Sequence, residues 1–177
     1  MSKPRIATLW LDGCSGCHMS LLDIDERIIA LAGMIELVYG PLVDIKEFPE
    51  GVDVAVVEGA VSSVEDEHKI RIVRERSKFL IALGDCAVTA NVPGMRNYYT
   101  CEAVLDRAYY ENATIQAQTP NVGIPALLPK ALPLHEFVKV DLYVPGCPPQ
   151  ADAIYYVLSE LVEGRIPDLA GKTRFGI

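Results

Sequence analysis

Residues 6–18 read IATLWLDGCSGCH, an apolar run followed at once by two cysteines flanked by glycine. Residues 6–11 have the length and composition of a buried β-strand, and Cys14 and Cys17 come directly after it. Two later apolar runs end in the same way, since FLIALGDC places Cys86 after a strand and LYVPGC places Cys147 after another. The carboxyl ends of parallel strands share one edge of a sheet, so we expect the four thiols to converge there.

Strand-like runs alternate with helical patterns, which is typical of βαβ units and a mostly parallel sheet. The predicted strands are 6–11, 35–39, 53–57, 79–83 and 141–144, and the predicted helices are 17–32, about 63–77, and the segment between PGCPP and Gly164. Gly33 is expected to end the first helix, and Ser62 and Ser63, which precede acidic residues at capping-box distance, are expected to open the second. The sequence therefore predicts one α/β domain over residues 1–177.

Residues 91–139 differ from the rest because they contain five prolines and only a short helical pattern, at 102–110. A long, weakly patterned segment in a compact domain is usually functional or packed on another molecule. We interpret this segment as a Pro-rich insertion that faces a partner protein.

The overall composition excludes several classes of function. A net charge of -8 would repel a phosphate backbone, so nucleic acid is not an expected partner. The longest apolar runs are far shorter than the roughly 20 residues of a membrane-spanning helix, and no secretory signal is recognisable at the amino terminus. We therefore expect no membrane span, a cytoplasmic location and reduced thiols rather than disulfides.

The spacing Cys14-x-x-Cys17 has three ordinary meanings: a thiol-disulfide redox pair, half of a zinc site, or two ligands of an iron-sulfur cluster. Cys86 and Cys147 favour a metal centre, because a dithiol enzyme needs no third and fourth thiol. Structural zinc usually takes its ligands in two close pairs, whereas the later cysteines are single and far apart. One 4Fe-4S cluster is the preferred interpretation, and zinc and a redox dithiol stay open.

Four other residues lie close to these motifs. Glu58 ends a strand and is expected to face the same sheet edge, where it could relay protons or hold a hydrogen-bond network. Asp85 precedes a candidate ligand in a tight turn, so its side chain is expected to hold backbone. His18 follows a candidate ligand but is expected to bind no metal. Cys101 has no matching partner and is expected to be a small buried hydrophobe.

Four segments together resemble the small subunit of NiFe hydrogenases: GCSGCHMSLL, VEGAV, GDCAV and VPGCPPQADAI. The resemblance covers residues 6 to about 162 and is greatest to the compact subunit of cytoplasmic NAD-reducing enzymes. The related 20 kDa iron-sulfur subunit of respiratory complex I has two adjacent cysteines where this chain has Cys14 and Cys17 spaced apart.

The resemblance implies a flavodoxin-like three-layer domain with one 4Fe-4S cluster held by Cys14, Cys17, Cys86 and Cys147. It also implies a large partner subunit with the NiFe centre, a partner diaphorase with FMN and its own clusters that reduces NAD, and a chain that is inactive alone. Glu58 matches a glutamate that faces the catalytic subunit. Because the chain has 177 residues, we expect no additional carboxyl-terminal cluster domain. A subunit of complex I type, or of a hydrogenase with another acceptor, is the alternative, and flavin in this chain is not favoured.

Overall fold

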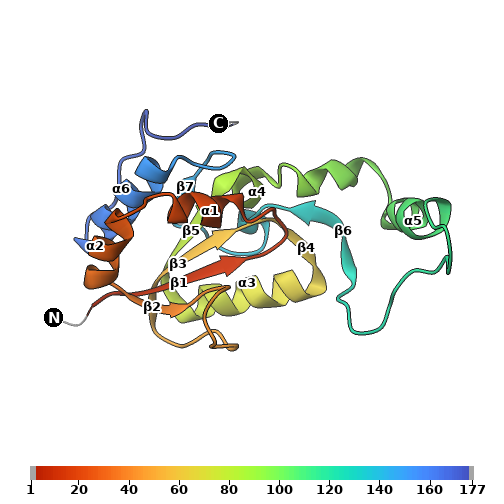
Figure 1. Cartoon of the computed structure of the whole chain (residues 1–177), viewed down its shortest axis with the longest axis horizontal. Coiled ribbons are helices and arrows are strands. Elements are labelled where there is room, and N and C mark those ends of the chain that lie inside the picture. Colours follow the sequence, from red (N-terminus) through yellow and green to blue (C-terminus); the bar gives the residue numbers. More distant parts are fainter. Residues whose placement is uncertain (1–2, 176–177) are drawn as a thin grey trace.

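The computed structural model describes residues 3–175 and is built on a five-stranded parallel sheet with the order β2-β1-β3-β5-β7 (Figure 1). The strands are β1 (Arg5–Trp10), β2 (Glu36–Tyr39), β3 (Val52–Glu58), β5 (Ser77–Leu83) and β7 (Leu142–Val144). With the separate strands β4 and β6 set aside, this is the strand order of flavodoxin-like folds. The prediction of a mostly parallel α/β domain is confirmed.

Hydrophobic clusters cover both faces of the sheet, which explains why its central strands are apolar along nearly their whole length. One face is covered by α1 (Gly16–Leu22), α2 (Arg27–Met34) and α6 (Ala151–Val162). The other face is covered by α3 (Val64–Arg76) and α4 (Gly84–Thr89). The layers are visible in Figure 1, where α3 and the helix pair α1 and α2 lie on opposite sides of the strands.

The single helix predicted for residues 17–32 is wrong, because the structure has two helices there. Asp25 has φ 54, in the left-handed region that a continuous helix does not visit. Ile24 is completely buried, so the break directs an apolar side chain into the core. Gly33 does not end the helix either, since it lies inside α2.

The predicted start of α3 is confirmed in detail. The Ser63 side chain accepts a hydrogen bond from the backbone N–H of Asp66, and the Asp66 carboxylate accepts one from the backbone N–H of Ser63. This reciprocal pair is a capping box, which satisfies backbone donors that the first helical turn leaves free. Ile70 and Val73 then form the buried face of the helix.

The Pro-rich insertion contributes one strand to a two-stranded sheet that the sequence did not predict. Its strand β6 (Leu127–Leu132) pairs antiparallel with β4 (Val61–Ser63), which lies before α3 and outside the insertion. The insertion also contains η1 (Pro93–Tyr98), α5 (Cys101–Asp106) and η2 (Arg107–Glu111). A further short helix, η3 (Leu134–Glu136), leads back to β7. Figure 1 shows α5 extending well away from the sheet. The strands were missed because β4 has only three residues and β6 contains a proline.

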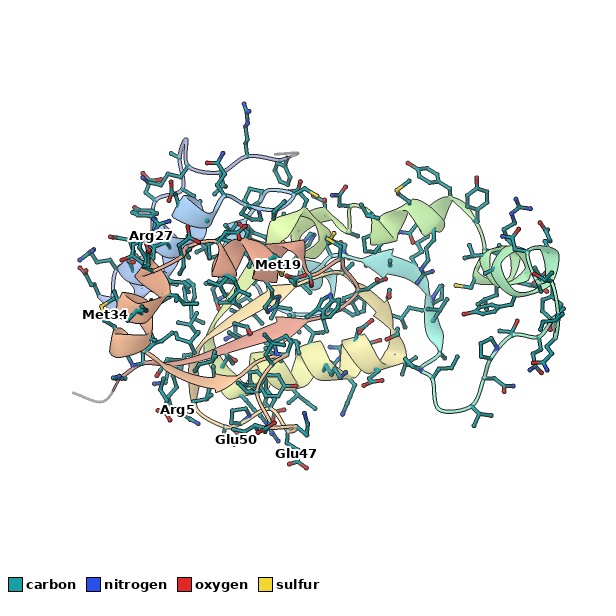
Figure 2. The ribbon with its side chains drawn as sticks, in the orientation of Figure 1. Arg5, Met19, Arg27, Met34, Glu47 and Glu50 are labelled. Atoms are coloured by element: carbon teal, nitrogen blue, oxygen red, sulfur yellow. The ribbon has the colours of Figure 1, made fainter. Side chains whose placement is uncertain are left out.

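The amino-terminal end of the sheet is held by polar contacts. The Arg5 guanidinium donates to the carbonyl oxygens of Glu50 and Gly51, and Arg76 lies 2.9 Å from the Glu50 carboxylate. Figure 2 places Arg5, Glu47 and Glu50 together at this margin of the molecule. Within residues 3–175 no helix has the length and hydropathy that crossing a bilayer requires.

Candidate metal centre

The carboxyl ends of four neighbouring strands form one row across the sheet. Trp10 pairs in register with Glu58, Glu58 pairs with Leu83, and Leu83 pairs with Val144. Three of these strands, β1, β5 and β7, lead directly into the segments that carry the four predicted cysteine ligands, and β3 ends on Glu58 itself. The edge lies where the connections from β1 and β3 run to opposite sides, the usual ligand site of such sheets.

The four cysteines are free thiols whose environments depend on one another. Burial raises the pKa of the Cys17 thiol strongly, and the negative charges of Glu58, Cys86, Cys14 and Cys147 raise it further. Burial also raises the pKa of Cys86, although a hydrogen bond from the Val92 backbone acts in the opposite direction. Because the other three thiols all act on Cys17, cysteines that are distant in sequence lie within electrostatic range of one another in the fold.

The thiols are partitioned between the interior and the surface. Cys14 and Cys147 are exposed, whereas Cys17 and Cys86 are partly buried. Among residues 3–175 no group of three or more His, Cys, Asp or Glu side chains is spaced to hold one metal ion. A single tetrahedral zinc ion needs its sulfur ligands about 2.3 Å from the metal and therefore close to one another.

Two glycines leave room for the sulfur atoms. At Gly84, with φ 82, an added Cβ would lie 2.2 Å from the Cys17 sulfur. At Gly16 an added Cβ would lie 3.2 Å from the Cys14 sulfur. Glycine is required at the first position both by its left-handed backbone and by this close approach.

Asp85 ties two of the cysteine-bearing loops together. Its backbone N–H donates to the Gly146 carbonyl at 2.8 Å, and its carboxylate accepts from the Gly146 N–H at 2.7 Å. The contact is buried and fixes Cys86, one residue along, relative to Cys147. The predicted role of Asp85 in holding backbone is confirmed.

Glu58 is almost completely buried, with 2% of its surface exposed, and it contacts the first turn of α1. Its Oε2 atom accepts from the backbone N–H of His18 at 2.6 Å and lies 2.6 Å from His18 Nδ1. The carboxylate at the end of β3 therefore caps the amino terminus of α1, where the helix dipole also favours negative charge. This pair was not predicted, because its partners are 40 residues apart in sequence.

Three N–H groups point at candidate ligand sulfurs. The Gly16 amide donates to Cys14 Sγ at 3.4 Å, the Val92 amide donates to Cys86, and the Asn91 side chain donates to Cys147 Sγ at 3.6 Å. Sequence reasoning missed Asn91, since it lies 56 residues from the cysteine that it contacts.

Cys101 does not join the other four cysteines. It begins α5 in the insertion, where its sulfur donates to the Leu128 carbonyl at 3.1 Å and lies 3.3 Å from the Arg96 guanidinium. The side chain is only partly buried, so the prediction of a buried hydrophobe is wrong. Its polar contacts hold α5 against β6.

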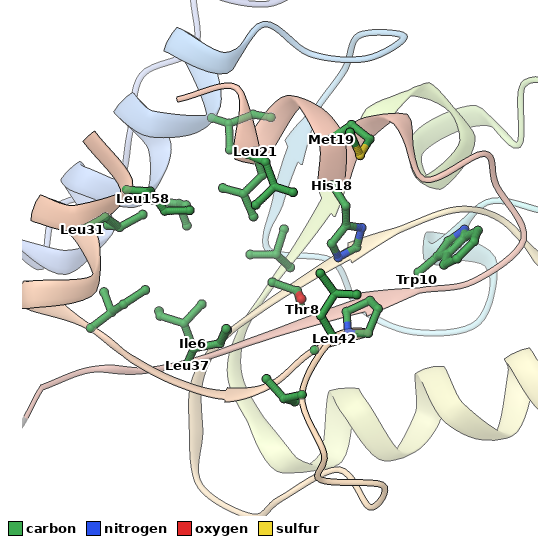
Figure 3. A pocket seen from close by; sticks show the side chains of 18 of the residues that line it. Ile6, Thr8, Trp10, His18, Met19, Leu21, Leu31, Leu37, Leu42 and Leu158 are labelled. Carbon is green, nitrogen blue, oxygen red and sulfur yellow. The ribbon is translucent and has the colours of Figure 1, made fainter. Parts of the chain in front are cut away.

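An apolar cavity of about 440 Å³ lies beside the first cysteine loop (Figure 3). Its walls come from β1, α1, α2 and residues 40–43, with Thr8, Trp10 and His18 among the lining residues. His18 Nε2 is buried in the described structure without a hydrogen-bond partner. The imidazole thus spans the space between the Glu58 carboxylate and this cavity.

A redox dithiol formed by Cys14 and Cys17 would leave Cys86 and Cys147, which follow strands ending at the same sheet edge, without a role. A cluster site has several features that are found here: four thiols at one edge, N–H groups that point at three of them, and glycines that leave space for the sulfur atoms.

Comparison with protein families gives one match over most of the chain. Residues 14–161 match the family described as NADH ubiquinone oxidoreductase, 20 Kd subunit. The matched region begins at Cys14 and includes all four cysteines at the sheet edge.

Individual proteins give matches over nearly the whole chain. The delta subunit of the NAD-reducing hydrogenase HoxS of Cupriavidus necator is 43% identical over 172 residues, which are 94% of this chain and 82% of that protein. A subunit of the F420-non-reducing hydrogenase vhu of Methanocaldococcus jannaschii is 39% identical over 170 residues. The match spans 95% of this chain but only 59% of the archaeal protein.

Among solved structures, a chain of an NAD+-reducing [NiFe]-hydrogenase in the H2-reduced state superposes with a TM-score of 0.94 at 38% identity. The alignment covers 98% of this chain and 99% of that chain. The fold described above is therefore shared along its whole length.

Proposed function

The chain belongs to the family of the NADH ubiquinone oxidoreductase 20 kDa subunit, and from that premise we propose that it is the electron-transferring small subunit of a NiFe hydrogenase. The proposal is supported by its similarity to hydrogenase subunits over nine-tenths or more of its length. It works as part of an enzyme complex and is inactive alone.

One observation carries the proposal: four thiols from three strand ends meet at one edge of the sheet. Their residues fit a 4Fe-4S cluster, because a group of four irons and four sulfides is wider than one ion and needs ligands that stand further apart. Cys14, Cys17, Cys86 and Cys147 would hold it, and Gly84 leaves space at the Cys17 sulfur. When bound, the cluster would accept and release one electron at a time.

The proposed route begins at a NiFe centre in a large partner subunit, where hydrogen is oxidised. Electrons leave this chain toward a diaphorase subunit that carries FMN and its own clusters and reduces NAD. The NAD-reducing route is supported by the greater coverage of the HoxS delta subunit than of the vhu subunit, 82% against 59% of their lengths. Similarity to F420-non-reducing hydrogenases supports a different acceptor as the second candidate.

We propose that the Pro-rich insertion contacts partner subunits. Large apolar side chains on the insertion are exposed. Among them are Tyr98 and Tyr99 at the end of η1, and Ile115, Val122 and Ile124 in the loop before β6. This many exposed large apolar side chains on one segment support an interaction site there. The cytoplasmic location and the single domain over residues 1–177 remain predictions.

Glu58 is proposed as a proton relay at the same interface. Its contact with His18 gives it a neighbour that can hold and pass a proton, and His18 also lines the apolar cavity. Replacement Glu58→Gln keeps the size of the side chain but cannot take up a proton at neutral pH. We expect slower hydrogen turnover in the complex with an unchanged iron content.

The decisive experiment is anaerobic purification of the full chain with iron and sulfide analysis. We expect about four of each per chain, and loss of both in Cys86→Ser and Cys147→Ser. Cys101→Ser is the matched control and should keep its cluster, since Cys101 lies apart from the other thiols. Tightly bound zinc without visible charge-transfer absorption would refute the proposal. Mass spectrometry of co-purifying chains would identify the partners.

A further inference from the structure

The turn after α4 directs hydrogen-bond donors at two candidate ligands. α4 ends at Thr89, and the capping residue Ala90 has φ 63 and donates its N–H to the Cys86 carbonyl at 3.0 Å. The next two residues are the donors: the Val92 backbone amide serves Cys86, and the Asn91 side chain serves Cys147. The Gly94 N–H donates back to the Ala90 carbonyl at 2.8 Å, which closes the turn. The donors are thus held on a rigid piece of backbone.

The contact from Asn91 differs from the others because it comes from a side chain. Its Nδ2 atom lies 3.6 Å from Cys147 Sγ, an ordinary distance for an N–H group and sulfur. In the part of the chain that the structure describes, Cys147 is the hydrogen-bond partner found for this amide. A backbone donor survives every substitution except proline, whereas a side-chain donor can be removed by mutation without changing the fold.

We propose that Asn91 sets the reduction potential of the cluster by donating a hydrogen bond to the Cys147 sulfur. The inference rests on the proposed function, in which Cys147 is a cluster ligand. Reduction adds negative charge, part of which resides on the ligand sulfurs, and an N–H donor stabilises that charge. Donors to the sulfurs therefore raise the potential. Because Cys147 is exposed, any other hydrogen bond to its sulfur would come from solvent or from a partner chain.

The size of the effect follows from the usual contribution of one hydrogen bond. One such bond changes an equilibrium constant about fivefold, and here the equilibrium is cluster reduction. For a one-electron couple, tenfold corresponds to about 59 mV, so fivefold corresponds to about 40 mV. Removing the donor is expected to make the potential more negative by that amount.

The test uses the full chain, purified anaerobically, and titrated with redox mediators while the cluster is followed by electron paramagnetic resonance. Asn91→Leu removes the donor at nearly constant size and should lower the potential. Asn91→Asp also places a negative charge at the sulfur and should lower it more. Resonance Raman spectra should show a changed iron–cysteine stretching band in both variants. Asn121→Leu, in the exposed loop before β6, is the matched control and should change neither property.

The two proposals fail in different ways. A wild-type chain without iron and sulfide would overturn the proposed function, and the role of Asn91 with it. A full cluster whose potential is the same in wild type, Asn91→Leu and Asn91→Asp would overturn the role of Asn91 alone. If Asn91→Leu loses its cluster, the isosteric Asn91→Asp decides by the same criterion.

Discussion

Replacement of Gly84 by alanine should damage the metal centre much more than it damages the fold. Gly84 has φ 82, so a side chain there costs about 1–2 kcal/mol of stability for the left-handed backbone alone. The added Cβ would also lie 2.2 Å from the Cys17 sulfur, which is too close for two non-bonded atoms. The sulfur can move away at modest cost, because rotation about the Cα–Cβ bond of Cys17 alone displaces it.

Rotation of that sulfur removes a ligand from the site. We therefore expect Gly84→Ala to unfold about 1–2 kcal/mol more easily in urea, while the iron content of the purified chain falls to less than about half. Gly123→Ala is the control for the backbone alone, since φ there is 74 and no atom lies near the added Cβ. It should lose similar stability and keep all its iron.

Gly33→Ala controls for the replacement of glycine by alanine at a position without left-handed backbone or a close neighbour. Gly33 lies in α2 with nothing near the added Cβ, so alanine should stabilise the chain by about 0.5–1 kcal/mol. The reasoning is refuted if Gly84→Ala keeps as much iron as Gly123→Ala. It is also refuted if both left-handed glycines tolerate alanine without loss of stability.

Three further substitutions test contacts that stabilise the fold. The backbone N–H of Arg5 and then the Lys78 side chain lower the pKa of Asp53, so the ionised carboxylate stabilises the folded state above its usual pKa of 3.8 and loses that effect as pH falls. Asp53→Asn should therefore lower the free energy of unfolding by up to about 1 kcal/mol at pH 7. The difference in free energy of unfolding between this variant and wild type, measured by urea denaturation, should become smaller below about pH 4. Ser63→Ala removes the capping box and should cost about 0.5–2 kcal/mol in the same assay. Asp85→Ala leaves a buried backbone N–H without its acceptor, which should cost about 1–3 kcal/mol and lower iron content together with stability; unchanged iron would show that the tie between the two loops is dispensable.

The strands of the parallel sheet, its carboxyl edge and the four thiols that follow it could be predicted from the sequence. Apolar runs such as residues 79–83 can be recognised as strands, because a strand covered on both faces needs apolar residues at nearly every position. Alternation with helices makes the strands parallel, and parallel strands bring their carboxyl ends together. Cys14, Cys86 and Cys147 could therefore be assigned to one edge before any coordinates were known.

Local patterns failed where the core decided the backbone. The break between α1 and α2 places Ile24 in the interior, and neither glycine nor proline marks it in the sequence. The pairing of β4 with β6 joins segments more than 60 residues apart, so no window of sequence contains it.

Only the tertiary structure decided what surrounds the sulfurs. The contacts of Glu58 with His18 and of Asn91 with Cys147 span 40 and 56 residues, and each joins segments that are neighbours only after the sheet has formed. Residue identity determines which atoms can bind a cluster, because ligand chemistry belongs to the side chain. The hydrogen bonds and burial that adjust those ligands depend on distances between loops, and these distances exist only in the folded chain.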